Sequence, residues 1–153
     1  MNVEFINPFL NALINVVDIM GHTGLMPEKP RIKTNDVSMG AVSGLIGLVG
    51  PQTKGSLSIT FETSLALRIM QRMLGDKLKE IHKDVIDMVG EITNMVSGGA
   101  KDELSKMGYE FDMATPIVVS GINHSIDHKH EGHVIIIPFN SDSGKVYIEI
   151  CFD

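Results

Sequence analysis

The chain has 153 residues, of which 43 % are apolar and 21 % charged, a composition typical of a globular domain with one hydrophobic core. Its net charge of −6, without any run of Lys or Arg, argues against a basic surface for nucleic acid. Cys151 is the only cysteine, which excludes an internal disulfide, and no apolar run is long enough to span a bilayer. We expect one domain over residues 1–153, with no secretory leader, no membrane partner and a cytoplasmic location.

The first half of the chain predicts one helix followed by three strands. Apolar residues recur at helical spacing from Phe9 to Met20, and Asn7-Pro8 and Gly21 are the expected start and end of this helix. Three strands, separated by turns that contain glycine or proline, are then predicted at 31–37, 44–49 and 55–61.

The second half predicts two helices followed by three strands. The helices cover 63–74, ended by Gly75-Asp76, and 83–106, ended by Gly108. Strands rich in Val and Ile are predicted at 115–120, 133–140 and 145–152, and Asp142-Ser143-Gly144 joins the last two as a hairpin.

This order, α-βββ-αα-βββ, predicts an α+β fold. An antiparallel sheet with the long helices packed on one side suits elements grouped in this way better than a parallel sheet does. The two triplets of strands hint at internal pseudo-symmetry, although no residue-level repeat is visible in the sequence.

The long helix over 83–106 has an apolar and a polar face when its residues are placed about 100° apart. Glu103 is the exception, since the wheel directs it inward. The apolar face, which we expect to meet the core, holds Val85, Ile86, Met88, Val89, Ile92, Met95, Val96, Gly99, Ala100, Leu104 and Met107. The polar face holds Asp87, Gly90, Glu91, Asn94, Ser97, Gly98, Lys101 and Ser105.

Asp87, Glu91 and Asn94 are the candidate functional residues on this polar face. Their spacing of four and three stacks them along one side of the helix. Gly98 follows one turn later, where core packing gives no reason for a glycine, so a partner can approach closely there. The plain alternatives are a solvated helix face and a kink at Gly98-Gly99.

A bare Glu-x-x-Asn pattern is weakly specific, because it occurs twice in this chain. The other copy is Glu4-Phe5-Ile6-Asn7, directly before Pro8. There we interpret Asn7 as a helix cap.

At Asp87, Glu91 and Asn94 the chain resembles the CheC/CheX/FliY family of chemotaxis phosphatases, most closely the CheX type. The family motif is an Asp or Ser, three residues, Glu, two residues and Asn, with a proline some 22 residues later. Pro116 follows Asn94 after 21 residues, one fewer than usual. The likeness extends to two further stretches, Gly98 to Lys101 and the opening Phe5 to Phe9.

The resemblance implies a protein phosphatase that acts on the phospho-aspartate of a CheY-like response regulator. By this analogy Asn94 orients the attacking water, and Glu91 pairs with the active-site lysine of the receiver. Asp87 and Gly98 contribute to docking, and Pro116 has no chemical role. No cofactor on this chain is required, because the receiver brings its own Mg²⁺.

The resemblance also implies a homodimer that joins sheets between subunits. The stretch Val146 to Ile150 is one strand whose edge would serve. CheC-type members carry two copies of the motif, whereas this chain shows one convincing copy, which favours the CheX type.

Two other functions compete with the phosphatase. The polar helix face of the same fold would serve a non-catalytic module that binds a receiver or a flagellar-switch partner. Alternatively, four histidines within the polar stretch 121–132 and at its end, together with Asp127, would bind a transition metal if their geometry converged. These histidines are His124, His128, His130 and His133, and solvated loop side chains are the simpler interpretation.

The methionines have a plain structural interpretation. Five of them lie at helical core spacing, where flexible thioethers fill gaps, and we expect them in the core: Met20, Met70, Met73, Met88 and Met95.

Overall fold

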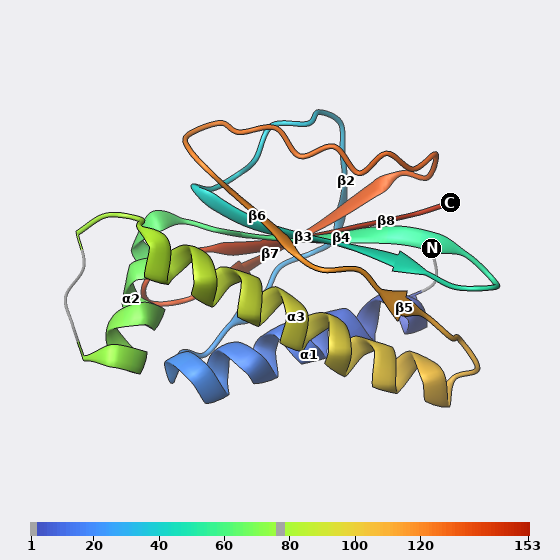
Figure 1. Cartoon of the computed structure of the whole chain (residues 1–153), viewed down its shortest axis with the longest axis horizontal. Helices are drawn as coiled ribbons and strands as arrows, with labels where there is room; N and C mark the ends of the chain where they lie inside the picture. Colours follow the sequence, from blue (N-terminus) through green and yellow to red (C-terminus); the bar gives the residue numbers. More distant parts are fainter. Residues whose placement is uncertain (1–2, 76–78) are drawn as a thin grey trace.

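A computed structural model describes residues 3–75 and 79–153 and confirms the α+β fold (Figure 1). In this part of the chain the helices are α1 (Val3–Gly21), α2 (Thr63–Leu74) and α3 (Lys83–Lys106). The strands are β1 (Met26–Pro27), β2 (Arg31–Lys33), β3 (Val42–Val49), β4 (Lys54–Phe61), β5 (Asp112–Met113), β6 (Ile117–Ser120), β7 (Val134–Asn140) and β8 (Val146–Phe152). No helix among these is long and apolar enough to cross a membrane.

All described strands form one antiparallel sheet, and the strands on the two sides of its centre are arranged alike. Its order is β1-β7-β8-β4-β3-β5, and β2 and β6 add to the outer sides of β7 and β3. The hairpins β3–β4 and β7–β8 meet at the centre, where β4 pairs with β8. Each hairpin therefore receives at its outer side the short strand that belongs, in sequence, to the other half of the chain.

The helices cover one face of the sheet, and the two faces differ in chemistry (Figure 1). The helix-facing side is apolar and forms the core with buried residues of α1, including Phe5 and Phe9, whose rings lie 4.8 and 6.4 Å from that of Phe152. The opposite side carries buried polar residues, among them Ser43, Ser58, Thr60 and Glu149. Figure 1 shows the β2–β3 and β6–β7 connections running over this polar side.

Helix α3 lies close to β3 because a glycine and a threonine meet there. A Cβ placed on Gly44 would clash with Thr93 of α3. The Thr93 hydroxyl donates to Val89 O at 2.7 Å, and Ser97 donates to Thr93 O at 2.8 Å, so both buried hydroxyls are satisfied within the helix. The missing side chain of Gly44 thus fixes how near α3 approaches the sheet.

The predicted start of the first helix was wrong. Helix α1 begins at Val3, with Pro8 inside it, and ends at Gly21 as expected. Phe5 and Ile6 are buried, and their packing extends the helix ahead of Pro8. Asn7 is therefore a residue within the helix and not its cap.

The predicted strand over 31–37 is shorter in the structure. Only 31–33 pair with β7, while Val37 forms an isolated bridge with Ser125. The two-residue strands β1 and β5 were not predicted, since such short segments leave no period to detect. The other helices and strands agree with prediction to within two residues at each end, and the expected stop at Asp76 lies outside the described residues.

The proposed dimer edge at Val146 to Ile150 was also wrong. Strand β8 pairs with β4 on one side and β7 on the other, and its residues are buried. The unbroken Val/Ile pattern of this strand reflects burial on both faces at the sheet centre. A sheet-joining dimer would have to use the outer strands instead.

We predict that Gly44→Ala lowers the free energy of unfolding by about 1–3 kcal/mol, because the added methyl overpacks the contact with Thr93. Gly47→Ala in the same strand is the matched control, since its Cβ would meet only Ala114 at an ordinary 3.8 Å. Urea unfolding of both variants measures the difference. Equal stabilities would show that Gly44 does not set the position of α3.

Candidate functional site

The three candidate residues of α3 lie together on its solvent side. Asp87, Glu91 and Asn94 are all exposed, and each lies about one turn from the next. The helix is continuous from Lys83 to Lys106, and its start is capped by His82, which accepts from Asp84 N at 3.2 Å. The structure therefore brings these residues together on an accessible, regular helix.

Packing on the inner side of α3 holds Asn94 in place. Thr93, the residue before it, is fully buried against Gly44 of β3. Ile92 is fully buried as well, so Asn94, a further 100° around the helix from Thr93, points away from the sheet. The close contact between Gly44 and Thr93 thus lies one residue away from the candidate amide.

The helical wheel misassigned several neighbours of the site. Ser97, expected on the polar face, is 1 % exposed, whereas Met95 and Met107, expected in the core, are 39 % and 41 % exposed. Ser97 is buried because its hydroxyl bonds back to Thr93 O. Glu103, expected to point inward, is exposed and pairs with Lys106 at 3.3 Å.

An apolar wall formed by Met73 and Leu74 of α2 lies beside the carboxylates and was not predicted as part of the site. Met73 is 39 % exposed, although we expected it in the core, and Leu74 is 55 % exposed. A hollow of about 410 Å³ separates α2 from α3 and is lined by Met70, Met73, Leu74, Asp84, Asp87, Met88 and Glu91. Only the position of Met73 and Leu74 at the very end of a predicted helix could have indicated their exposure.

The charge around this hollow is negative on one wall and absent on the other. Asp84, Asp87 and Glu91 supply three carboxylates from α3, while the α2 wall is apolar. Such a surface suits a cationic side chain that carries an aliphatic stem, as lysine does.

Gly98, which is half-buried, follows Asn94 by about one turn and has no packing reason to be a glycine. A Cβ on Gly98 would meet nothing within 4 Å, and α3 continues as an α-helix through it. Gly99 differs, since its Cβ would lie 3.3 Å from that of Ala12 in α1, as expected for a glycine that lets a neighbouring element pack closely. Pro116, half-buried, stands directly before β6.

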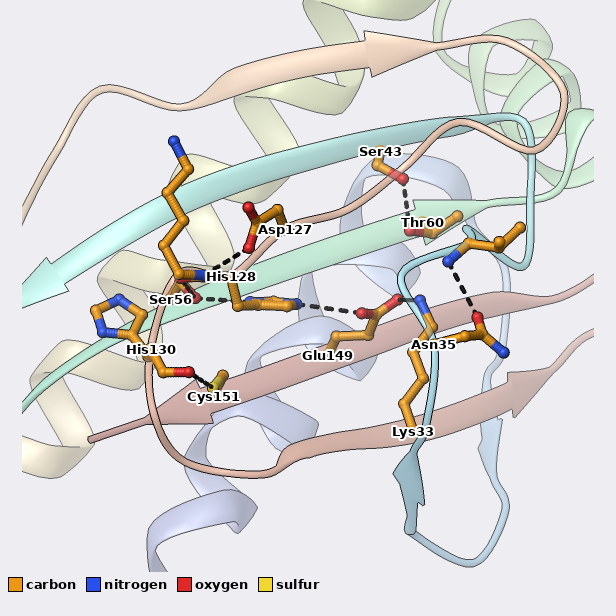
Figure 2. A network of polar contacts seen from close by, with 12 residues as sticks. Lys33, Asn35, Ser43, Ser56, Thr60, Asp127, His128, His130, Glu149 and Cys151 are labelled. Carbon is orange, nitrogen blue, oxygen red and sulfur yellow. Dashed lines mark hydrogen bonds and ion pairs between the residues drawn. The ribbon is translucent and has the colours of Figure 1, made fainter.

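His128 forms hydrogen bonds with residues on the polar side of the sheet (Figure 2). His128 is only 7 % exposed, so for this residue the interpretation as a solvated loop side chain was wrong. Its Nε2 donates to Glu149 Oε1 at 3.1 Å, and its Nδ1 shares a 2.6 Å hydrogen bond with Ser56 Oγ. Lys33 Nζ donates to the other oxygen of Glu149 at 2.9 Å. Glu149 needs these partners because it is fully buried.

The other histidines have separate partners. His124 bonds to Ser43 Oγ through Nε2 at 2.7 Å and to Gly121 O through Nδ1 at 2.7 Å, and His130 pairs with Asp153 at 3.0 Å. His133 is exposed. In the described residues no group of three or more His, Cys, Asp or Glu could hold a metal ion. The histidines therefore do not converge as the metal hypothesis requires.

Cys151 lies next to this network, and we expect its thiol to be unreactive (Figure 2). Its thiol is buried and donates to Gly132 O at 3.2 Å. Burial, with a smaller contribution from the charge of Asp153, raises the pKa of the Cys151 thiol. The thiol therefore stays protonated, which disfavours a nucleophilic role.

Comparison with known proteins relates the chain to CheX chemotaxis phosphatases. A family model described as "Chemotaxis phosphatase CheX" matches residues 42–140, which include Asp87, Glu91, Asn94 and Pro116. Among curated proteins, the CheY-P phosphatase CheX of Thermotoga maritima is 23 % identical over 142 residues, covering 92 % of this chain and 89 % of that protein.

Two solved structures show how closely the fold is shared. The chemotaxis protein CheX of Vibrio vulnificus is 58 % identical, covers 99 % of this chain and 100 % of its own, and superposes with a TM-score of 0.92. The complex of CheX with CheY, BeF3 and Mg2+ from Borrelia burgdorferi matches at 24 % identity over 99 % of both chains, with a TM-score of 0.81.

We predict that Glu149→Gln lowers the free energy of unfolding by about 3–5 kcal/mol, because it leaves the buried Lys33 without a counter-charge. Glu28→Gln is the matched control, since Glu28 and Lys145 form an exposed pair and stability should change little. Urea unfolding at pH 7 compares the two. Similar effects for both variants would show that burial does not make the Glu149 pair critical.

Proposed function

Since the chain belongs to the CheX family of chemotaxis phosphatases, we propose that it hydrolyses the phospho-aspartate of a CheY-like receiver, with Glu91 and Asn94 as the residues that act. The observation that carries this proposal is their exposure, one turn apart, on a helix fixed against the sheet. The relative from Thermotoga maritima is named as a phosphatase of CheY-P, and the complex from Borrelia burgdorferi pairs CheX with CheY.

Asn94 acts by positioning a water molecule. Its amide offers both an acceptor and a donor, so it can hold a water in line with the phosphorus–oxygen bond. The carboxamide cannot remove a proton at neutral pH, so its contribution is orientation and not general-base catalysis. This role requires an exposed side chain on a rigid support, as Asn94 has.

Glu91 acts by docking the receiver. Its carboxylate would pair with the active-site lysine of the receiver, and the apolar wall of Met73 and Leu74 would contact the aliphatic part of the partner. Asp87, next to Glu91 at the same hollow, adds negative charge for the same cation. The Mg²⁺ that neutralises the phosphoryl oxygens would come with the receiver, so this chain needs no metal of its own.

The proposal places the protein in the cytoplasm, where CheY-like receivers act. We also propose a homodimer, and the sheet leaves its outer strands for that contact. Ile117 in β6 is 67 % exposed and Met26 in β1 is 70 % exposed, one at each side of the sheet.

We predict that Asn94→Ala lowers the stimulated rate of receiver dephosphorylation by at least about tenfold, because the water is no longer held in line. Release of inorganic phosphate from a CheY-like receiver, loaded with acetyl phosphate, measures the rate. Ser105→Ala, at an exposed position further along α3, is the control and should retain the full rate. An unchanged rate in Asn94→Ala would contradict the assignment. Tight receiver binding without any hydrolysis by the unmodified protein would favour a non-catalytic binding module.

Gly98→Ala separates docking from stability. The methyl group meets nothing within 4 Å, so the better helix propensity of alanine should raise the free energy of unfolding by about 0.5–1 kcal/mol. If the receiver approaches α3 at Gly98, the same variant should bind the BeF3-activated receiver more weakly. Gly99→Ala, which faces Ala12 of α1, is the comparison variant and should leave receiver affinity unchanged. Unaltered affinity in Gly98→Ala would remove Gly98 from the docking surface.

A further inference from the structure

Helix α3 contains three glycines, and packing within the chain accounts for only one of them. A glycine inside a helix is less favourable than an alanine, so each of the three needs a compensating reason. Gly99 has one, because its Cβ would lie only 3.3 Å from that of Ala12 in α1. Gly98 borders the proposed docking surface. Gly90, the third, stands directly before Glu91 in the sequence.

Neither packing nor backbone conformation requires a glycine at position 90. A Cβ placed on Gly90 would lie 3.4 Å from Val118 Cγ2 of β6, which is an ordinary van der Waals distance. Helix α3 continues as an α-helix through Gly90, so the left-handed conformation that favours glycine is not needed there. Gly44 differs, since its Cβ would clash with Thr93. The reason for Gly90 therefore lies on the solvent side, to which this half-buried residue is open.

Gly90 is the residue over which the Asn94 side chain is expected to lie. Side chains of a helix lean towards its N-terminus, so each one lies over the residues three and four positions earlier. For Asn94 these residues are Glu91 and Gly90. Cβ atoms four positions apart on a helix are separated by about 5–6 Å. A methyl group at position 90 would thus take up the space on the N-terminal side of the Asn94 carboxamide.

Val118 bounds this space on the side of the sheet. It pairs with Gly44, whose Cβ would point at α3, so the half-buried Val118 faces the helix as well. Its methyl groups offer no hydrogen bond, so they close the space without competing with Asn94 for a water molecule. The missing side chain of Gly90 thus leaves a notch with the Asn94 carboxamide on one side and Val118 on the other.

We propose that Gly90 is a positioning residue of the site formed by Glu91 and Asn94 (the α3 site), where its notch admits the attacking water and the approaching phosphoryl group. This inference rests on the proposed function of Glu91 and Asn94. The water, held by the Asn94 carboxamide, attacks phosphorus, and the bond to the aspartate oxygen breaks to release the free carboxylate. One proton of the water stays on the phosphate and the other passes to solvent, so no further reactant is required.

Gly90→Ala tests the role of the notch. Phosphate release from an acetyl-phosphate-loaded CheY-like receiver, measured at several receiver concentrations, gives kcat and KM separately. We expect kcat to fall at least about fivefold because the methyl displaces the water, and KM to stay within about twofold because Glu91 still docks the receiver. The urea midpoint should not fall, since alanine favours the helix and its Cβ meets Val118 at an ordinary distance.

Val118→Ala controls for packing between α3 and β6. In the double variant Gly90→Ala/Val118→Ala, the shortened side chain of β6 leaves room for the added methyl, so α3 keeps its distance from the strand. We expect the double variant to remain at least about fivefold slower than Val118→Ala alone, because the methyl still lies beside Asn94. A double variant as fast as Val118→Ala would assign Gly90 to helix–strand packing and overturn the inference.

The outcomes separate this inference from the function on which it rests. If the unmodified protein is active and Gly90→Ala keeps its full kcat, the α3 site stands and the role of Gly90 is overturned. A raised KM with an unchanged kcat would also contradict it, since the glycine would then admit the receiver and not the water. A receiver that stays at its spontaneous rate with the unmodified protein would remove both the function and the inference. Ser105→Ala should match the unmodified protein in kcat and KM.

Discussion

The close approach of α3 to β3 determines most of the geometry described above. Gly44 has no side chain, so Thr93 can lie directly on the strand, and its hydroxyl is satisfied by Val89 O within the helix. Because Ile92 and Thr93 are both buried, Asn94 points outward, and the helix cannot rotate without breaking the contact between Thr93 and Gly44. The packing of α3 against β3 thus determines which side chains of the α3 site face the solvent.

A site of this kind suits a reaction in which the partner carries the charge. Among the described residues no group of three or more His, Cys, Asp or Glu could hold a metal ion, and burial raises the pKa of the Cys151 thiol. The chain supplies the amide of Asn94 and the carboxylate of Glu91 on one helix, beside the apolar wall of α2. Positioning alone can lower a barrier substantially when the reacting groups would otherwise have to find one another. In the proposed enzyme, α3 therefore contributes to catalysis by holding Glu91 and Asn94 in position.

The sequence predicted the helices, the longer strands and the fold class, because their apolar periods are long and regular. It also predicted that Asp87, Glu91 and Asn94 share an exposed face. It failed where tertiary contacts override a local pattern. Ser97 is buried because a helical hydroxyl can bond to its own backbone, and Met73 is exposed because α2 ends beside α3. The central position of β8 and the start of α1 ahead of Pro8 depend on pairing and packing across the whole chain.

The strand registers relate the two halves of the chain by a pseudo-two-fold axis, since a shift of 91 residues takes the pairs of β3 and β4 onto those of β7 and β8. On the polar side of the sheet this symmetry is broken for an electrostatic reason. Ser58 and Glu149 are equivalent residues that face each other across the axis. Directly opposed side chains in an antiparallel pair lie about 5 Å apart, so a glutamate at both positions would bury two like charges together. One half must therefore differ, and Glu149 alone takes the partners that burial demands, Lys33 and His128.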